Sequence, residues 1–284
     1  MAGGLVPMFG RLLAAGSPSA IKTIRAGLML ANSPYCITLP DRKQLSALIP
    51  RSETDPFGAE GPRAVAPRTP QKALSKEELD LKELAETNCE KALEILQADG
   101  WHQVDSEEED GLFVRDSGGR TIWKFRTVIK CCPEKFAQEL LHKCENCPSW
   151  NQTIQQCHQT HRIADGVEII HQVTGLLFGG VVSKREFVNL RRLGRRGDMH
   201  YSAVASIEHR DLPLRSSFVR ALNFPTVLTV SPMDGAPNHC VVEGTLNYDL
   251  KLRMVPQLLI QRGTLSVWRQ LRTQMLALAE RVRG

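Results

Sequence analysis

The sequence predicts an α+β fold in which a curved antiparallel sheet wraps around a long C-terminal helix. Residues 76–97 have helical periodicity, residues 123–250 carry a series of short strand-like runs, and a second long helical pattern begins at Pro256. Consecutive short strands separated by turns favour an antiparallel meander. Because the last helix is apolar over a wide arc, it must be covered on most sides, and a curved sheet can cover it.

The first helix carries its own start and stop signals. Ser75 and Glu78 stand at capping-box spacing, in which the side chain of each residue binds the backbone N–H of the other. Gly100 ends the helical pattern. Between these signals the apolar residues recur at helical spacing, at Leu81, Leu84, Ala85, Cys89, Ala92, Leu93 and Leu96.

The strand-like runs begin after the turn at Gly118 and Gly119. Side chains at positions 123, 125, 127 and 129 are apolar or threonine and alternate with mostly charged ones, which is typical of a half-buried strand. Pro133 then opens a short helix. The other runs are short and punctuated by turns, and they cover residues 152–163, 167–174, 185–194, 199–207, 218–222, 226–232 and 239–250.

Composition and charge narrow the function classes. The chain has 284 residues, 42% of them hydrophobic and 24% charged, which is ordinary for a globular protein. Its net charge of +5 comes from residues 1–75, which carry nine basic and four acidic residues, whereas the remainder carries 27 of each sign. A nucleic-acid partner is therefore not predicted. No apolar run is long enough to predict a transmembrane helix.

The N-terminal region differs from the rest of the chain. Residues 1–40 contain Arg11, Lys22 and Arg25 but no acidic residue, a pattern typical of a mitochondrial targeting segment. The alternative is an unstructured tail on a cytoplasmic protein. Residues 41–74 are rich in proline and predict a linker, so the folded domain is expected to span residues 75–284.

Motifs for covalent or metal chemistry are weak. The sequence contains no nucleophile elbow, zincin motif or phosphate loop, and its eight histidines have no ligand spacing. Cys144 and Cys147 form a C-x2-C pair, and Cys157 with His158 or His161 would complete a zinc set. Neighbours on a strand point to opposite faces, so Cys157 and His158 would not converge on one metal ion, and we expect reduced thiols and no metal. Because the catalytic motifs are missing, we also expect no cofactor and no enzyme activity.

The segment 179–207 is the most informative. Phe187, Asn189 and Arg191 share one face of a predicted strand, and Arg192 lies on the other. One arginine must therefore point inward, where a guanidinium needs a partner. The alternative is an edge strand on which both arginines reach water.

The same segment, GGVVSKREFVNLRR, resembles the signature of the START (StAR-related lipid transfer) domain family, and is closest to its sterol-binding branch. The resemblance runs from Lys76 to the C-terminus. It includes Gly100-Trp101 after the first helix, Trp150-Asn151, VRALNFPT at 219–226 and NYDLK at 247–251. It implies the helix-grip fold of that family, with an apolar tunnel between the sheet and the last helix.

The resemblance also implies a lipid-binding site. Arg191 falls on the buried tunnel arginine of the family, and the acidic partner of that arginine is replaced here by Gln172. The charge would then be held by hydrogen bonds, water or a neighbour such as Glu168. The lipid-binding residues predicted in this way are Arg191, Asn151, Gln172, Asn189, Asn223 and Thr226.

The function implied by the resemblance is a monomeric lipid carrier. It would bind one sterol, with cholesterol as the expected ligand, make transient contact with membranes and deliver the sterol to mitochondria for steroid synthesis. The expected gate is the loop 211–217 together with the helix around Pro256 to Gly263, whose charged residues as far as Ala279 are all basic. The alternative is a regulatory module that binds another hydrophobic ligand.

Overall fold

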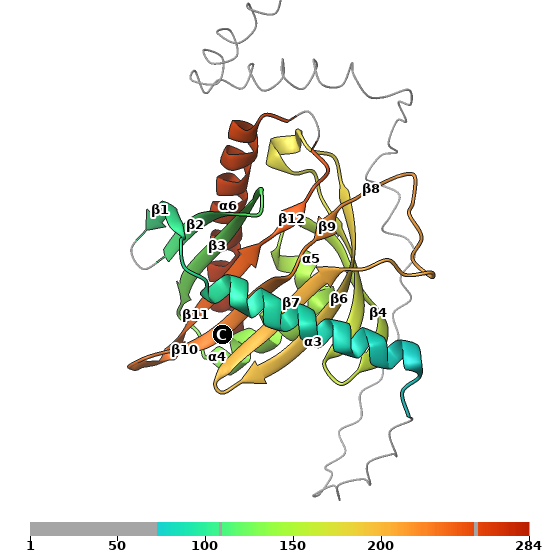
Figure 1. Ribbon diagram of the computed structural model, residues 1–284. Helices are drawn as coiled ribbons and strands as arrows, with labels where there is room; N and C mark the ends of the chain where they lie inside the picture. Colours follow the sequence, from blue (N-terminus) through green and yellow to red (C-terminus); the bar gives the residue numbers. More distant parts are fainter. Residues whose placement is uncertain (1–72, 108–109, 253–254, 284) are drawn as a thin grey trace, which may run out of the picture. The chain divides into compact units, whose positions relative to one another are not determined.

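The computed structural model describes residues 73–107, 110–252 and 255–283 (Figure 1). The predicted targeting segment and nearly all of the predicted linker lie outside these residues. Residues Leu74–Gly284 pack together as one unit. Within the described part of the chain, no helix is both long enough and apolar enough to span a membrane.

Helix α3, Lys76–Gln97, begins at the predicted capping box. Glu78 N donates to Ser75 Oγ at 3.2 Å, and Ser75 N donates to Glu78 Oε2 at 2.6 Å. These two bonds satisfy N–H groups that a helix start otherwise leaves open. Five of the seven predicted apolar positions are buried, whereas Leu84 is 41% exposed.

The sheet is antiparallel along the order β1-β2-β3-β11-β10-β7-β6-β5-β4. Strand β1, which follows α3 and pairs with β2, forms one edge of the sheet, and β4 forms the other edge. The strands are β1 His102–Glu107, β2 Asp110–Ser117, β3 Arg120–Ile129, β4 Ile154–Ala164, β5 Val167–Thr174, β6 Arg185–Arg196, β7 Met199–Ser206, β10 Thr226–Met233 and β11 Ala236–Leu246.

Three very short strands complete the topology. β8, Val219–Arg220, pairs in parallel with β6, and β9, Leu222–Asn223, pairs with β12, Tyr248–Asp249. The run predicted as one strand over 239–250 is therefore divided. Asn247 divides it, because its N–H donates to Thr226 Oγ1 and its side chain to Pro225 O, both at 3.2 Å.

The alternation of side chains along the strands gives the sheet two apolar faces. One face packs against α3, with Ala85 among Ile169, Val188 and Leu190, and Leu93 near Tyr201. The other face packs against helix α6, Gln257–Arg283. We call these surfaces the α3 face and the α6 face of the sheet.

Helix α6 confirms the predicted arrangement of a sheet around a terminal helix (Figure 1). Trp268 is 3% exposed, and its ring stacks on that of Phe125 with centroids 5.0 Å apart. Three short elements between β3 and β4 add Phe136, Leu141 and Trp150 to the same core. These elements are helix α4 (Pro133–Ala137), a π-helical turn (Gln138–His142) and helix α5 (Cys147–Trp150).

Candidate functional site

Strand β6 places the two adjacent arginines on opposite faces, as the period of two requires. Arg191 is 5% exposed on the α6 face. Arg192 lies on the α3 face, where its Nε donates to Glu86 Oε1 at 2.8 Å. The prediction that one arginine points inward is therefore confirmed, and the alternative of two solvent-facing arginines is wrong.

Glu168 of β5 holds the buried guanidinium. It lies directly opposite Arg191 in the β5–β6 register. Arg191 Nε donates to Glu168 Oε1 at 2.6 Å, and Nη2 contacts the same oxygen. Arg191 Nη1 also donates to Leu141 O, in the π-helical turn, at 3.1 Å. A buried charge is tolerable when it is paired and hydrogen-bonded in this way.

Gln172 does not lie opposite Arg191, although the resemblance implied that the charge partner of this arginine stands at position 172. It lies opposite Phe187, four residues along β5 from Glu168, although on the same face as Arg191. The substitution at this position does not leave Arg191 uncompensated, because Glu168 supplies the carboxylate.

Asn189 lies beside this ion pair on β6 and is fully buried. Its Oδ1 accepts hydrogen bonds from Ser206 Oγ at 2.9 Å and from Asn223 Nδ2 at 3.3 Å. Its Nδ2 is buried and has no hydrogen-bond partner among the described residues. A buried donor without a partner costs about 1–3 kcal/mol, so this atom is a candidate contact for a ligand oxygen.

The structure brings Arg191, Asn189 and Asn223 together. The other two predicted residues, Asn151 and Thr226, instead make hydrogen bonds to nearby turns and strands. Asn151 Oδ1 accepts from Thr153 N at 3.0 Å and from Thr153 Oγ1 at 2.6 Å, which closes the turn after α5. Thr226 Oγ1 donates to Thr245 O at 3.4 Å, which joins the start of β10 to the end of β11.

A second buried polar cluster lies on the α3 face and was not predicted. Glu186 is 1% exposed, and its Oε1 lies 2.8 Å from His171 Nε2. Arg220 Nε donates to Glu186 Oε2 at 3.0 Å. This cluster ties β5, β6 and β8 together.

Two of the cysteines, Cys144 and Cys157, form a hydrogen-bonded pair of thiols. Cys157 donates a hydrogen bond that lowers the pKa of the Cys144 thiol to about 7, with nearby Arg191 also lowering it, and the same bond raises the pKa of Cys157. Burial raises the pKa of Cys147 to about 12. Among the described residues, the group of three side chains that could hold a metal lies elsewhere, at His161, His209 and Asp211.

The loop between β5 and β6, residues 175–184, packs against the start of α6. A Cβ added to Gly263 of α6 would overlap the Phe178 ring, so the ring rests directly on the helix backbone. Phe178 itself has a φ of +53°, which is uncommon for a residue with a side chain. The loop 211–217, which was predicted from the sequence as part of the gate, does not share this position, because its Leu212 packs on the α3 face.

The fold is that of a START domain, and the chain belongs to the START domain family, whose match covers residues 82–282. Among curated proteins, the chain is similar to the mitochondrial steroidogenic acute regulatory protein of Danio rerio, with 30% identity over 177 residues that cover 61% of each chain. The same protein of Mus musculus is 27% identical, over 62% of this chain and 63% of the relative. The chain thus spans less than two thirds of the length of these relatives.

Solved structures agree on the fold. Human StAR-related lipid transfer protein 5 has a TM-score of 0.67 at 16% identity, covering 73% of this chain and 100% of the other. Human STARD10 has a TM-score of 0.58 at 17% identity, covering 67% of this chain and 78% of the other. The family resemblance predicted from residues 179–207 is therefore confirmed.

Proposed function

We propose that this chain is a lipid carrier without enzymatic activity, and that it holds one sterol between the α6 face of the sheet and helix α6. The observation that carries this proposal is the buried pair Arg191–Glu168 beside the unpartnered Asn189 Nδ2, on a face that is otherwise largely apolar. Such a face suits a ligand with a large apolar body and one small polar group. The similarity to steroidogenic acute regulatory proteins supports a sterol, and cholesterol is the sterol we propose.

Free energy explains why a carrier of this kind also needs a gate. Roughly 27 sterol carbons, at about 0.8 kcal/mol each, favour an apolar pocket over water by on the order of 20 kcal/mol. A bilayer offers nearly the same environment, so the pocket needs only to match it and to open at its surface. In this proposal the gate is the loop 175–184 resting on Gly263.

Membrane contact is part of the same proposal. Leu176, in the gate loop, is 55% exposed, and Leu258, in the first turn of α6, is 54% exposed. Leu176 lies shortly before Phe178 in the chain, and Leu258 lies one to two helical turns before Gly263. Exposed leucines beside a gate suit transient insertion into a lipid surface, and Arg262 adds positive charge on the same helix.

The polar contact can be tested with a fluorescent sterol. Asn189→Leu should weaken sterol binding about three- to tenfold, because it removes one hydrogen bond to the sterol hydroxyl. Asn238→Leu, at an exposed position in β11, is the matched control and should bind like the parent. The measurement is a titration of the full-length chain, with a mass spectrum of the lipid that copurifies with it. Equal affinity in both variants would place the polar group elsewhere, and a different hydrophobic ligand in the spectrum would favour the regulatory module.

We also propose that residues 1–40 direct the protein to mitochondria, since they are basic and lack acidic residues. A fluorescent protein fused to these residues should accumulate in mitochondria. Arg11→Glu combined with Arg25→Glu should abolish that accumulation, because the targeting pattern depends on positive charge. If the fusion stays diffuse, a cytoplasmic protein that contacts membranes peripherally is the better description.

A further inference from the structure

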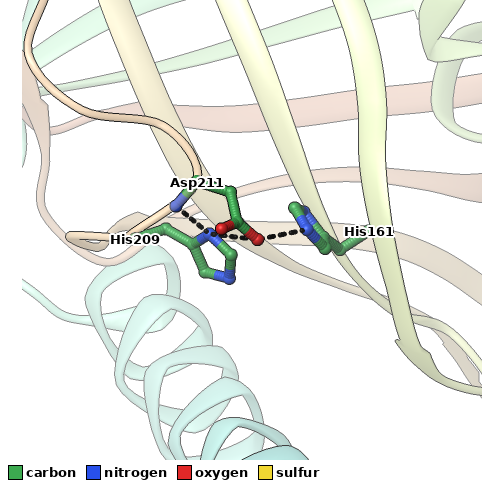
Figure 2. Close-up of side chains that lie close together, drawn as sticks. All are labelled: His161, His209 and Asp211. Atoms are coloured by element: carbon green, nitrogen blue, oxygen red, sulfur yellow. Dashed lines mark hydrogen bonds and ion pairs between the residues drawn. The ribbon is translucent and has the colours of Figure 1, made fainter.

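Two histidines and an aspartate meet on the α3 face, away from the proposed lipid site (Figure 2). His161 comes from β4, whereas His209 and Asp211 come from the loop 207–218 that follows β7. His161 Nε2 lies 3.3 Å from Asp211 Oδ2, and His209 Nδ1 lies 4.0 Å from the same oxygen. One ligand atom from each of the three residues can be chosen so that all lie within 4.8 Å of one another.

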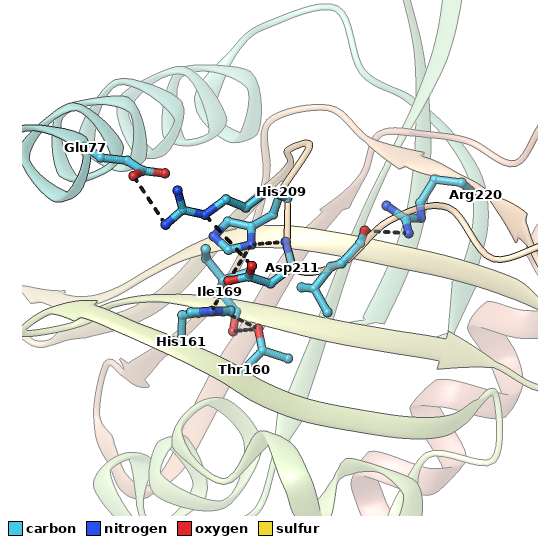
Figure 3. Close-up of polar contacts among 9 residues, drawn as sticks. Glu77, Thr160, His161, Ile169, His209, Asp211 and Arg220 are labelled. Atoms are coloured by element: carbon cyan, nitrogen blue, oxygen red, sulfur yellow. Dashed lines mark hydrogen bonds and ion pairs between the residues drawn. The ribbon is translucent and has the colours of Figure 1, made fainter.

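The hydrogen bonds around His161 leave a lone pair facing the carboxylate. The Thr160 hydroxyl donates its proton to Ile169 O at 3.1 Å, so it accepts from His161 Nδ1 at 3.2 Å (Figure 3). In the neutral imidazole the other nitrogen, Nε2, then carries no hydrogen. Metal-binding histidines generally donate their other ring N–H to an oxygen acceptor in this way, and that bond fixes the tautomer.

His209 places its Nδ1 near the same carboxylate. This nitrogen accepts the backbone N–H of Asp211 at 3.3 Å, so it carries no hydrogen, and its single lone pair is engaged in that long hydrogen bond. A metal ion would have to replace this N–H as the partner of Nδ1. The two histidines and the Asp211 carboxylate thus place three acceptors close together, and a cation among them would bind all three.

We propose that His161, His209 and Asp211 bind a divalent first-row transition metal ion, with zinc as the occupant that best fits the geometry. Two imidazoles, one carboxylate and a water form a common zinc ligand set. Ligand atoms about 2.0–2.2 Å from zinc in a tetrahedron lie about 3.4 Å apart. The 3.3 Å distance meets this value, and the 4.0 Å distance is closed by a small rotation of Asp211, whose side chain is 57% exposed.

Bound metal would fasten the loop 207–218 to strand β4. The loop is otherwise held through Arg220, whose Nη2 donates to Leu212 O at 3.2 Å and to Pro213 O at 3.1 Å. A metal ion would add a second attachment on the other side of Leu212. The site is distinct from the proposed lipid site, since Ile169, which lies opposite His161 in the register, packs on the α3 face.

One neighbouring charge opposes a cation at this site. Arg210 Nε lies 3.9 Å from Asp211 Oδ1, and its Nη2 lies 3.8 Å from Glu77 Oε2. The guanidinium repels a metal ion, and Glu77 offsets only part of that charge. Removing the positive charge should therefore tighten metal binding, which is the opposite of the effect of removing a ligand.

The test is a calorimetric titration of zinc chloride into the full-length chain, without an affinity tag and with a non-thiol reductant. We expect one site per chain. His161→Ala and Asp211→Asn should each weaken it at least about tenfold, because loss of a group that merely supports a ligand already costs that much. Arg210→Gln should tighten it several-fold. His158→Ala is the matched control, an exposed histidine on the same strand, and should leave binding unchanged.

A cobalt titration distinguishes these ligands from the cysteines. Cobalt held by thiolates absorbs strongly through charge transfer, whereas cobalt held by imidazole and carboxylate does not. Strong thiolate absorption that persists in His161→Ala would place the metal on the cysteines and overturn the proposal. Absence of binding, or equal binding in His158→Ala and His161→Ala, would also overturn it, whereas loss in Asp211→Asn with an unchanged melting curve supports it.

Discussion

Replacing Glu168 by leucine should lower the free energy of unfolding by about 3–5 kcal/mol. The substitution leaves the guanidinium of Arg191 buried, with Leu141 O as its remaining acceptor among the described residues. The reverse change, Arg191→Leu, should be similarly harmful because it leaves a buried carboxylate. The double variant Glu168→Leu with Arg191→Met removes both charges and should recover most of the lost stability, since apolar replacements of buried pairs are often neutral or stabilising.

The measurement is urea unfolding of the full-length chain, followed by circular dichroism, for the parent, both single variants and the double variant. Glu86→Ala is the control, because it breaks the equivalent pair with Arg192 on the α3 face, where Glu86 is 42% exposed. That half-exposed pair should contribute less than about 1 kcal/mol. Similar losses in Glu168→Leu and Glu86→Ala would mean that Arg191 reaches water and does not organise a buried site.

Local signals in the sequence predicted most of the elements of the fold. The capping box at Ser75, the alternation around Phe125 and the wide apolar arc of the last helix each specify one element, and the structure confirms all three. The hairpin of β1 and β2 was not predicted from periodicity. Its first strand, His102–Glu107, is mostly polar and lies at the sheet edge, where burial imposes no clear alternation.

The candidate site was predicted only in part, because its contacts depend on register. Periodicity indicated that Arg191 points inward, but it did not decide between Gln172 and Glu168 as the partner. That choice depends on which β5 residue lies opposite Arg191, and this register cannot be read from periodicity alone. The neighbouring pairing of β4 with β5 contains three register shifts. The cluster of His161 with Asp211 joins residues 50 positions apart and depends on the path of a loop.

Gly263→Ala should lower the free energy of unfolding by about 1–3 kcal/mol, although alanine is the better helix former. An exposed glycine in a helix would give the opposite sign, a gain of about 1 kcal/mol on substitution by alanine. Here the added Cβ would overlap the Phe178 ring, so the loop 175–184 must move off the helix. We therefore also expect a bound fluorescent sterol to leave the protein several-fold faster, since in the proposed function the closed loop retains the sterol.

The double variant Gly263→Ala with Phe178→Ala separates the clash from any other effect of the alanine. It removes the ring that the new methyl group meets, so it should be more stable than Gly263→Ala alone, and the two changes should be strongly non-additive. Gln261→Ala, at an exposed position on α6, is the control and should change neither property. Thermal unfolding and stopped-flow transfer of the sterol to acceptor vesicles measure the two quantities. If Gly263→Ala raises stability and leaves the release rate unchanged, the loop 175–184 does not close on α6, and the gate lies elsewhere.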